Sequence, residues 1–152
     1  MIEGVQLAPV KVNTDDRGYL IVIGSSGRKD APDLPVMREV YVVGDMAKGT
    51  VRAFHKHATL RDYFFISNGS AKFVLVDDRA GSPTKGEMNT FILTERNPSL
   101  LVVPAGVYHG WMSLEDDTQM VSIANEPYDV KNPDEKRIPP DSFGDVWTVK
   151  GR

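Results

Sequence analysis

The 152-residue sequence contains no cysteine, and this absence excludes two classes of structure. Disulfide bonds cannot form, and no metal site can use thiolate ligands. The absence is compatible with a reducing compartment, where disulfides do not persist. Any metal held by this chain would need nitrogen and oxygen ligands.

The sequence also lacks an excess of positive charge and a long apolar run. The 18 Lys and Arg residues are outnumbered by 21 Asp and Glu residues, so no basic field favours nucleic acid. The longest apolar runs, residues 63–66 and 100–103, are far too short to cross a bilayer. The residues after Met1 do not resemble a signal peptide. We therefore expect a cytoplasmic protein that binds neither nucleic acid nor membrane.

Helical periodicity is missing as well, since no stretch keeps it for three turns with caps. Short runs rich in β-branched and aromatic residues, bounded by turn residues, take its place. The runs lie at residues 18–24, 37–44, 50–57, 61–67, 71–79, 88–94, 99–104, 109–113 and 119–127. This pattern predicts an all-β fold, either a barrel or a double-sheet jelly roll.

The length and the distribution of these runs predict a single domain, residues 1–152. A chain of this size can bury one sizeable core without a second. We expect the barrel to occupy about residues 15–128. The tail at residues 129–152 is too polar for a core strand, so it is predicted to be a short helix or an arm packed on the barrel.

Asn68-Gly69 separates two of the predicted strands. This dipeptide is a strong signal for a type I′ hairpin turn, which needs positive φ at both central residues. We therefore expect residues 61–67 and 71–79 to pair directly.

Histidine is scarce, and its 3 copies all fall in two short segments, residues 49–69 and 102–113. His55 and His57 are two residues apart, so they share one face of a strand, and a neighbouring strand can bring Asp62 alongside. The second segment carries His109. This spacing resembles the paired motifs of the cupin superfamily, with aspartate in place of the usual glutamate, and implies a cupin-type jelly-roll barrel.

The three imidazoles and one carboxylate have two interpretations. His55, His57, Asp62 and His109 could together hold one divalent metal ion, since nitrogen and oxygen donors of this kind suit Fe, Mn, Ni, Cu or Zn. They could equally be barrel-lining side chains with hydrogen-bonded partners. Asp62 is one methylene shorter than glutamate, which weakens the metal interpretation because ligand oxygens must lie about 2 Å from the ion. We therefore expect no cofactor and keep one divalent metal as the alternative.

A longer resemblance covers residues 15 to about 147. The sequence is similar, in order and approximate spacing, to the dTDP-4-dehydrorhamnose 3,5-epimerase family. The matching pieces are residues 15–18, 52–55, 77–79 with 82–86, 104–111, and Tyr128 before a proline-rich acidic tail. Members of that family are metal-independent cupins, usually homodimers. They epimerise 4-keto-6-deoxy sugars attached to a nucleoside diphosphate during cell-surface polysaccharide synthesis.

The resemblance implies a nucleotide-sugar substrate, a homodimer and roles for particular residues. His55 falls on the catalytic histidine, and a neutral imidazole suits a base that removes the proton beside the C4 ketone near pH 7. Arg52 falls near the diphosphate, and Arg17 on an arginine that reaches the nucleotide of the neighbouring subunit. Tyr128 matches a tyrosine that contacts substrate. His109 and Trp111 belong to the pocket wall.

The sequence also departs from that family. Ser122, a far weaker acid, stands where the family has its proton-donating tyrosine. Asp62 stands where the family has a pocket lysine. Phe73 stands where the family has an aspartate. The chain ends soon after Trp147, so we expect no counterpart of the acidic partner of the catalytic histidine.

A related group, the dTDP-4-keto-6-deoxyglucose 3,4-ketoisomerases, accounts for part of the difference. Arg52, His55 and His57 are spaced as in that group, and Tyr41 is similar to one of its tyrosines. The resemblance implies His57 as a second catalytic residue and Tyr41 in the substrate site. Epimerase, ketoisomerase, metal-dependent cupin enzyme and non-catalytic nucleotide-sugar binding module all stay open.

Two geometric expectations follow from residue parity in strands. Tyr63 and Tyr41 are both possible substitute acids, but Tyr63 should face away from Asp62 and pack in the core. Arg52 and His55 are three residues apart, so a bulge or a twist at the strand end is needed to bring both into one pocket.

Overall fold

The computed structural model describes residues 1–150, which form strands and no helix, as the sequence predicts. No helix in this part of the chain has the length and apolar character to cross a membrane. In chain order the strands are β1 (Gln6–Pro9), β2 (Val12–Asp15), β3 (Gly18–Ile21), β4 (Glu39–Met46), β5 (Val51–Lys56), β6 (Asp62–Asn68), β7 (Ser70–Asp77), β8 (Met88–Thr94), β9 (Ser99–Val103), β10 (Val107–Ser113), β11 (Thr118–Ala124) and β12 (Lys136–Arg137).

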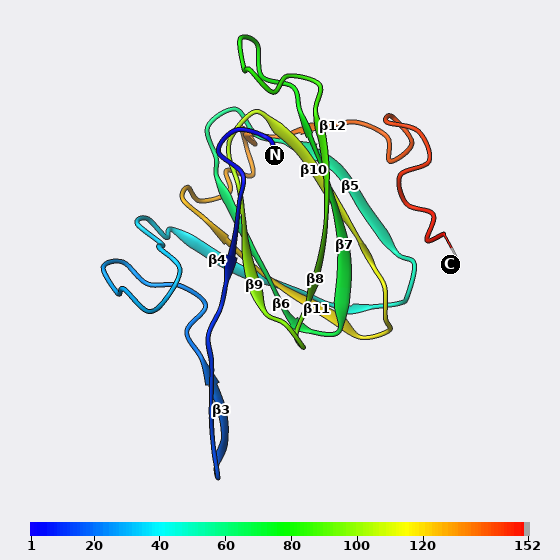
Figure 1. The fold of residues 1–152 in the computed structure, drawn as a ribbon. Coiled ribbons are helices and arrows are strands. Elements are labelled where there is room, and N and C mark those ends of the chain that lie inside the picture. Colours follow the sequence, from blue (N-terminus) through cyan, green and yellow to red (C-terminus); the bar gives the residue numbers. More distant parts are fainter. Residues whose placement is uncertain (151–152) are drawn as a thin grey trace.

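Two five-stranded antiparallel sheets face each other (Figure 1). The first sheet has the order β1-β9-β6-β11-β4 and the second β12-β5-β10-β7-β8. Strands β2 and β3 form a separate hairpin that projects away from both sheets, and we call it the arm (Figure 1). This double-sheet architecture agrees with the predicted jelly roll.

Alternation of side chains along the strands builds the core between the sheets. In β6, Phe64 and Ile66 point inward, and in β7, Phe73 and Leu75 meet them from the other sheet. All four side chains are almost completely buried. Burial of each such side chain stabilises the fold by about 1.5–3 kcal/mol.

The outer face of each sheet is covered by chain from one terminus. On the first sheet, Tyr63 packs with the N-terminal residues Val10 and Leu34, so its expected place in the core is confirmed. On the second sheet, the tail lays Phe143 and Trp147 against Phe54, with ring centroids 4.9 and 5.3 Å apart. The C-terminal tail is therefore an extended segment packed on the second sheet and not a helix. This agrees with one of the two predictions for the tail.

The prediction that Asn68-Gly69 forms a hairpin is wrong. Strand β6 pairs with β9 and β11, whereas β7 pairs with β8 and β10, so the chain changes sheets at this point. Only Gly69 of the dipeptide has positive φ, at 76°, so the type I′ turn does not form. A Cβ on Gly69 would lie 2.7 Å from Thr118 Oγ1, which shows how closely the corner packs on β11.

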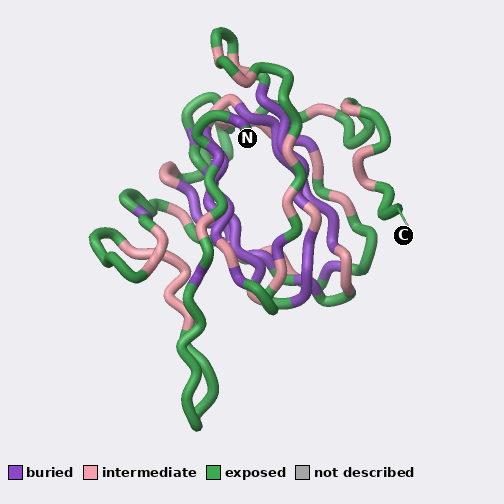
Figure 2. Tube along the Cα trace, viewed as in Figure 1, coloured by how far each residue is buried: buried purple, intermediate pink, exposed green. Residues whose placement is uncertain are grey.

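The expected irregularity in β5 is present. His109 of β10 lies opposite His55, and Trp111 lies opposite Arg52, so two steps along β10 match three along β5. This bulge changes the parity of β5 and lets Arg52 and His55 face the same side. Figure 2 shows the buried strands around the space between the sheets, and the largely exposed arm below them.

Candidate active site

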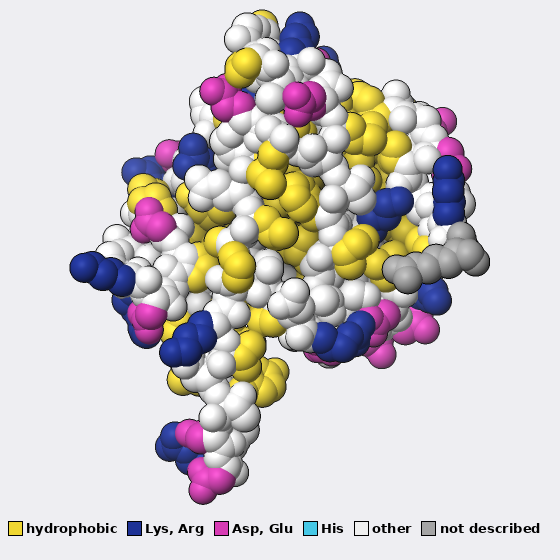
Figure 3. Space-filling model, viewed as in Figure 1, with side chains coloured by type: hydrophobic (Ala, Val, Ile, Leu, Met, Phe, Trp, Pro, Cys, Tyr) yellow, Lys and Arg dark blue, Asp and Glu magenta, His cyan; other side chains and the backbone are white. Residues whose placement is uncertain are grey.

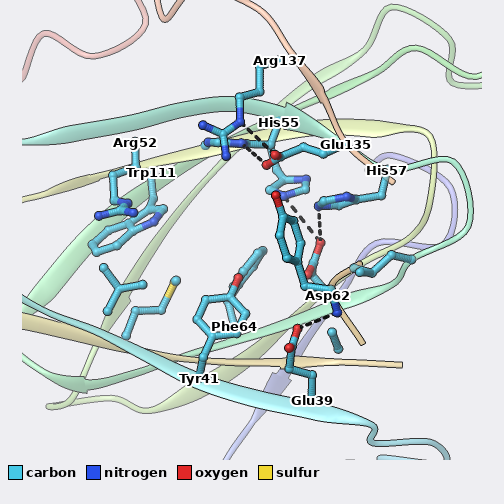
Figure 4. Close-up of a pocket in the computed structure, with 17 residues that line it drawn as sticks. Glu39, Tyr41, Arg52, His55, His57, Asp62, Phe64, Trp111, Glu135 and Arg137 are labelled. Atoms are coloured by element: carbon cyan, nitrogen blue, oxygen red, sulfur yellow. Dashed lines mark hydrogen bonds and ion pairs between the residues drawn. The ribbon is translucent and has the colours of Figure 1, made fainter. Parts of the chain in front are cut away.

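A cavity of about 360 Å³ opens between the two sheets (Figure 4). Strands β5, β10 and β12 of the second sheet supply one wall, and β4, β6 and β11 of the first sheet supply the other. The residues that line it are Glu39, Tyr41, Val43, Arg52, His55, His57, Leu60, Asp62, Phe64, His109, Gly110, Trp111, Met120, Ala124, Tyr128, Glu135 and Arg137.

The cavity brings together all but one of the site residues predicted from the sequence. The exception is Arg17, which lies at the turn of the arm between β2 and β3. Its side chain is 85% exposed and pairs with Asp15. Within one chain, Arg17 therefore does not contribute to this cavity.

Glu135 fixes the orientation and the tautomer of His55. The Nδ1 atom of His55 lies 2.6 Å from Glu135 Oε1, and the second oxygen of Glu135 accepts a hydrogen bond of 2.8 Å from Arg137 Nε. A carboxylate can only accept here, so Nδ1 carries the hydrogen and Nε2 keeps its lone pair. His55 thus offers a free basic nitrogen in the cavity.

Two opposing effects act on the pKa of His55. Burial disfavours the imidazolium and lowers the pKa below its ordinary value, while the Glu135 carboxylate raises it in part. Burial dominates, so His55 is neutral near pH 7. The imidazole is then ready to accept a proton, and the carboxylate stabilises the cation that results.

The structure corrects the expectation that His55 lacks an acidic partner. Glu135 comes from the segment before β12, which pairs with β5 at Lys136↔Lys56 and Arg137↔His55. Sequence reasoning missed Glu135 and Arg137 because no spacing relative to His55 identifies them. The only available signal was the charged stretch of residues 134–137 within an otherwise irregular tail.

Asp134 attaches this segment to the loop between β5 and β6. Its carboxylate accepts hydrogen bonds from the backbone N–H groups of Ala58, Thr59 and Leu60, and from the Thr59 hydroxyl. Burial alone would raise the pKa of Asp134, but these hydrogen bonds outweigh it and lower the pKa to about 2. A charged clamp therefore holds the neighbouring Glu135 beside His55.

The buried Asp62 and His109 converge with the partly buried His57 beside His55. The Nε2 atoms of His57 and His109 each lie 3.5 Å from Asp62 Oδ2. The Nδ1 atom of His57 donates to the backbone oxygen of Asp134, and that of His109 donates to Val107 O. If both imidazoles are neutral, each Nε2 atom has a lone pair that faces Asp62. An ionised Asp62 carboxylate can only accept hydrogen bonds, so a proton or a cation must lie between the three groups.

The pKa shifts in this cluster favour a shared proton. Burial raises the pKa of Asp62 to about 7 and lowers the pKa of His109 to about 3. A protonated Asp62 can donate to one Nε2, which satisfies the cluster without any further ion. This is the interpretation of the histidines as hydrogen-bonded wall residues.

A divalent cation fits the same three residues. The ligand atoms of His57, Asp62 and His109 all lie within 4.8 Å of one another, and backbone carbonyls orient both imidazoles in the way common around metal ligands. His55, the fourth ligand of the predicted set, is not in this group because its Nδ1 is held by Glu135. If a metal were bound there, it would supply a Lewis acid at the wall of the cavity.

Comparisons with known proteins identify related sugar epimerases. A family model described as dTDP-4-dehydrorhamnose 3,5-epimerase matches residues 1–144. The probable low-salt glycan biosynthesis epimerase Agl13 of Haloferax volcanii is 32% identical over 142 residues, which covers 92% of this chain and 89% of that protein. The spore coat polysaccharide biosynthesis protein SpsL of Bacillus subtilis is 34% identical over 158 residues, which covers 100% of both chains.

A solved structure shows the same architecture. The dTDP sugar isomerase of Desulfovibrio desulfuricans G20 superposes with a TM-score of 0.80 and 25% sequence identity, covering 93% of this chain and 87% of that one. The likeness extends over almost the whole described chain, so it includes both sheets that form the cavity.

Proposed function

Because the chain belongs to the dTDP-4-dehydrorhamnose 3,5-epimerase family, we propose that it isomerises a nucleotide sugar by removing a proton beside a 4-keto group. The proposed substrate is a 4-keto-6-deoxyhexose linked to dTDP. Both relatives carry names from glycan or polysaccharide synthesis, which supports the same pathway class for this chain. The predicted cytoplasmic location and single-domain organisation stay predictions.

The pairing of His55 with Glu135 carries this proposal. A hydrogen on the carbon beside a ketone is acidic because its loss gives an enolate, and a positioned base accelerates that loss by about 10²–10⁴-fold. His55 has the free Nε2, the neutral state and the carboxylate partner that the role requires. We assign His55 as the base and Glu135 as the residue that positions it.

Other cavity residues suit a nucleotide sugar. Arg52 and Arg137 lie at the cavity and can pair with a diphosphate, for which guanidinium is well shaped. Trp111, Tyr41 and Tyr128 offer aromatic surface and hydroxyl groups for the sugar and base. His109 belongs to the wall. His57 stays a proposed second proton-transfer group, since its Nε2 faces the Asp62 carboxylate.

A homodimer completes this proposal. The arm exposes Tyr19 and Leu20, and β4 at the edge of the first sheet exposes Val40 and Val42. An unpaired edge with apolar side chains is a surface on which a second copy can pack. A second copy would also bring the arm's Arg17 toward a neighbouring cavity, which is the role that the family resemblance implies for it.

Product identification tests the proposed reaction. Purified protein is incubated with a panel of dTDP-4-keto-6-deoxyhexoses, and the sugars are followed by proton NMR. We expect inversion beside C4 for an epimerase and movement of the keto group to C3 for a ketoisomerase. The matched variant His55→Asn should form neither product. Tight binding of the sugars with no product from the wild type would instead identify a binding module.

The metal-dependent cupin enzyme is the second candidate, favoured by the convergence of His57, Asp62 and His109. The main proposal uses no cofactor. Elemental analysis of untagged protein distinguishes the two, because the second candidate requires about one divalent ion per chain. Retention of full activity after dialysis against a chelator, with metal near zero, would exclude it.

A further inference from the structure

Tyr41 and His55 enter the cavity from opposite sheets. Tyr41 projects from β4 of the first sheet, and His55 from β5 of the second (Figure 4). A sugar ring held between the sheets would present one face to each residue. We propose that Tyr41 is the proton donor that protonates the sugar carbon from the face opposite His55. The inference rests on the proposed function and deepens it, because such a pair inverts the carbon.

Strand register explains why β4 carries this hydroxyl. Tyr41 lies directly opposite Ser122 of β11, and Ala124 lies opposite Glu39. Met120 and Ala124 both line the cavity, so Ser122 between them faces the same way. Ser122 is fully buried and is not among the residues that line the cavity. Its short side chain cannot extend into the cavity past the tyrosine, which occupies that space from the adjacent strand.

The other tyrosines are placed less well for this step. Tyr63 packs on the outer face of the first sheet, Tyr108 on the outer face of the second, and Tyr19 on the arm. Tyr128 does line the cavity, but it lies on the segment after β11, where its backbone N–H bonds to Glu39. A residue in a paired strand is held more rigidly than one in a connecting segment. Tyr41 is therefore the tyrosine with both access and fixed position.

The surroundings of Tyr41 keep its hydroxyl protonated. Burial raises the pKa of Tyr41 above its ordinary value and outweighs a hydrogen bond with Ser122, which acts to lower it. The carboxylates of Asp62, Glu39 and Glu135 act in the same direction as burial. The ring still retains access to solvent, since 43% of the residue surface is exposed. The phenol can thus give up a proton in the cavity and regain one from water.

The proton balance of the step is complete without any cofactor. His55 Nε2 takes the hydrogen beside the C4 ketone, and the electrons of the broken C–H bond form the enolate. Tyr41 gives its O–H proton to the same carbon from the other face, which makes a C–H bond of inverted configuration and leaves a phenolate. The phenolate then gains a proton, and the imidazolium loses one, through solvent at the open mouth of the cavity.

The variant Tyr41→Phe separates proton removal from proton delivery. It keeps the aromatic ring and loses only the hydroxyl. We expect formation of the epimerised dTDP sugar to fall by about 10²-fold or more. Exchange of the abstracted hydrogen with deuterium from heavy water should continue within about fivefold of the wild-type rate, because His55 still removes the proton and returns a deuteron to the same face. Tyr63→Phe, which loses a hydroxyl outside the cavity, should keep wild-type turnover.

Three outcomes would overturn the assignment. Turnover by Tyr41→Phe within about fivefold of the wild type shows that the hydroxyl is not the donor. Loss of both exchange and turnover in Tyr41→Phe shows that it serves proton removal or binding instead. Absence of both in the wild-type protein overturns the proposed function, and this assignment with it. The first two results leave the proposed function intact.

Discussion

A single carboxylate decides which nitrogen of His55 can accept a proton. Glu135 accepts a hydrogen bond from the Nδ1–H group, which leaves Nε2 with its lone pair in the cavity. In the proposed reaction, the same carboxylate would stabilise the imidazolium formed by proton transfer. Its effect on His55 resembles that of a buried aspartate on the histidine of a hydrolase triad.

We expect Glu135→Gln to lower kcat by about 10²-fold or more with a small change in KM. The amide can occupy the same space, but it has no charge and does not enforce the tautomer of His55. Steady-state kinetics with the dTDP sugar measure both parameters. Glu126→Gln is the control, because Glu126 pairs with Arg38 and does not line the cavity. Wild-type kcat in Glu135→Gln would remove Glu135 from the mechanism.

The pH profile gives an independent readout of the same pair. His55 acts as a base only when neutral, so kcat/KM rises with pH through its pKa. Burial lowers that pKa below the ordinary value of 6.5, so the acid limb of the wild-type profile should lie below pH 6.5. Glu135→Gln removes the charge that raises the pKa, and its acid limb should move to still lower pH. A shift to higher pH would contradict the assigned pairing.

Not every residue of the site could be found from sequence. Strand parity and motif spacing act over short distances and predict His55, His57 and Asp62, while His109 is predicted from the second of the paired motifs. Glu135 lies 80 residues from His55 in the chain. Its place depends on a two-residue strand added at the edge of β5, which leaves no periodic pattern to detect.

At the scale of elements, the segment before β12 completes the site. Its strand pairing with β5 covers two residues on each side, and Phe54 and Ile138 exchange two further backbone hydrogen bonds. Asp134 adds the clamp to the loop between β5 and β6, and it also receives the hydrogen bond of His57 at its backbone oxygen. One residue thus connects the position of Glu135 with that of His57.

The variant Asp134→Ala should destabilise the protein by about 1–2 kcal/mol at pH 7, since it removes hydrogen bonds to a charged acceptor. The pKa of Asp134 is lowered to about 2 from 3.8, so its stabilisation is present above pH 3.8 and is lost as the pH falls through about 2. Urea unfolding at pH 7, 5 and 3.5 measures the difference in the free energy of unfolding between wild type and Asp134→Ala. This difference should begin to decrease only at pH 3.5. Asp141→Ala, an exposed carboxylate on the tail, is the control. Equal stability of Asp134→Ala and wild type at pH 7 would exclude the clamp.

Element-level prediction failed at Asn68-Gly69 for a physical reason. The dipeptide favours a turn, and a turn does occur there, but local sequence does not encode which sheet the next strand joins. Where the chain crosses to the second sheet, Gly69 packs closely against Thr118 of β11, a contact between residues far apart in the sequence. The bulge in β5, in contrast, was predictable because Arg52 and His55 had to share a pocket.

At the scale of the whole molecule, the arm projects away from both sheets of its own chain (Figure 1). It exposes apolar side chains and carries charged residues at its tip (Figure 3). A hairpin with so little contact to the rest of its own chain is only marginally stable in isolation. A partner subunit would bury its apolar residues, which is why the proposed homodimer includes it.

Light scattering after size exclusion should therefore give twice the mass of one chain. Leu20→Asp places a charge on the apolar part of the arm and should shift the protein toward the monomer.

Arg17→Ala should leave the mass unchanged and raise KM for the dTDP sugar by about tenfold, because one guanidinium contact to substrate is lost. Arg28→Ala, another exposed arginine paired with an aspartate, is the matched control. A monomeric wild type with full activity would contradict both the dimer and the role of Arg17.

The all-β architecture was easier to predict from the sequence than the strand order or the site. Alternation of apolar residues along short strands, with turn residues between them, is sufficient to indicate an all-β fold. The pairing order of the strands could not be derived in the same way, because it depends on contacts between distant parts of the chain. The histidine motif was informative because it links two such distant parts, β5 and β10, which do pair.

The central claim is that His55 removes a proton beside the keto group of a nucleotide sugar. The most direct measurement is the incorporation of deuterium at C3 and C5 of a dTDP-4-keto-6-deoxyhexose in heavy water, followed by NMR. The account predicts incorporation with the wild-type protein at a rate at least about 10²-fold above that with His55→Asn. Equal incorporation by wild type and His55→Asn, or none by either across the panel of sugars, would contradict it.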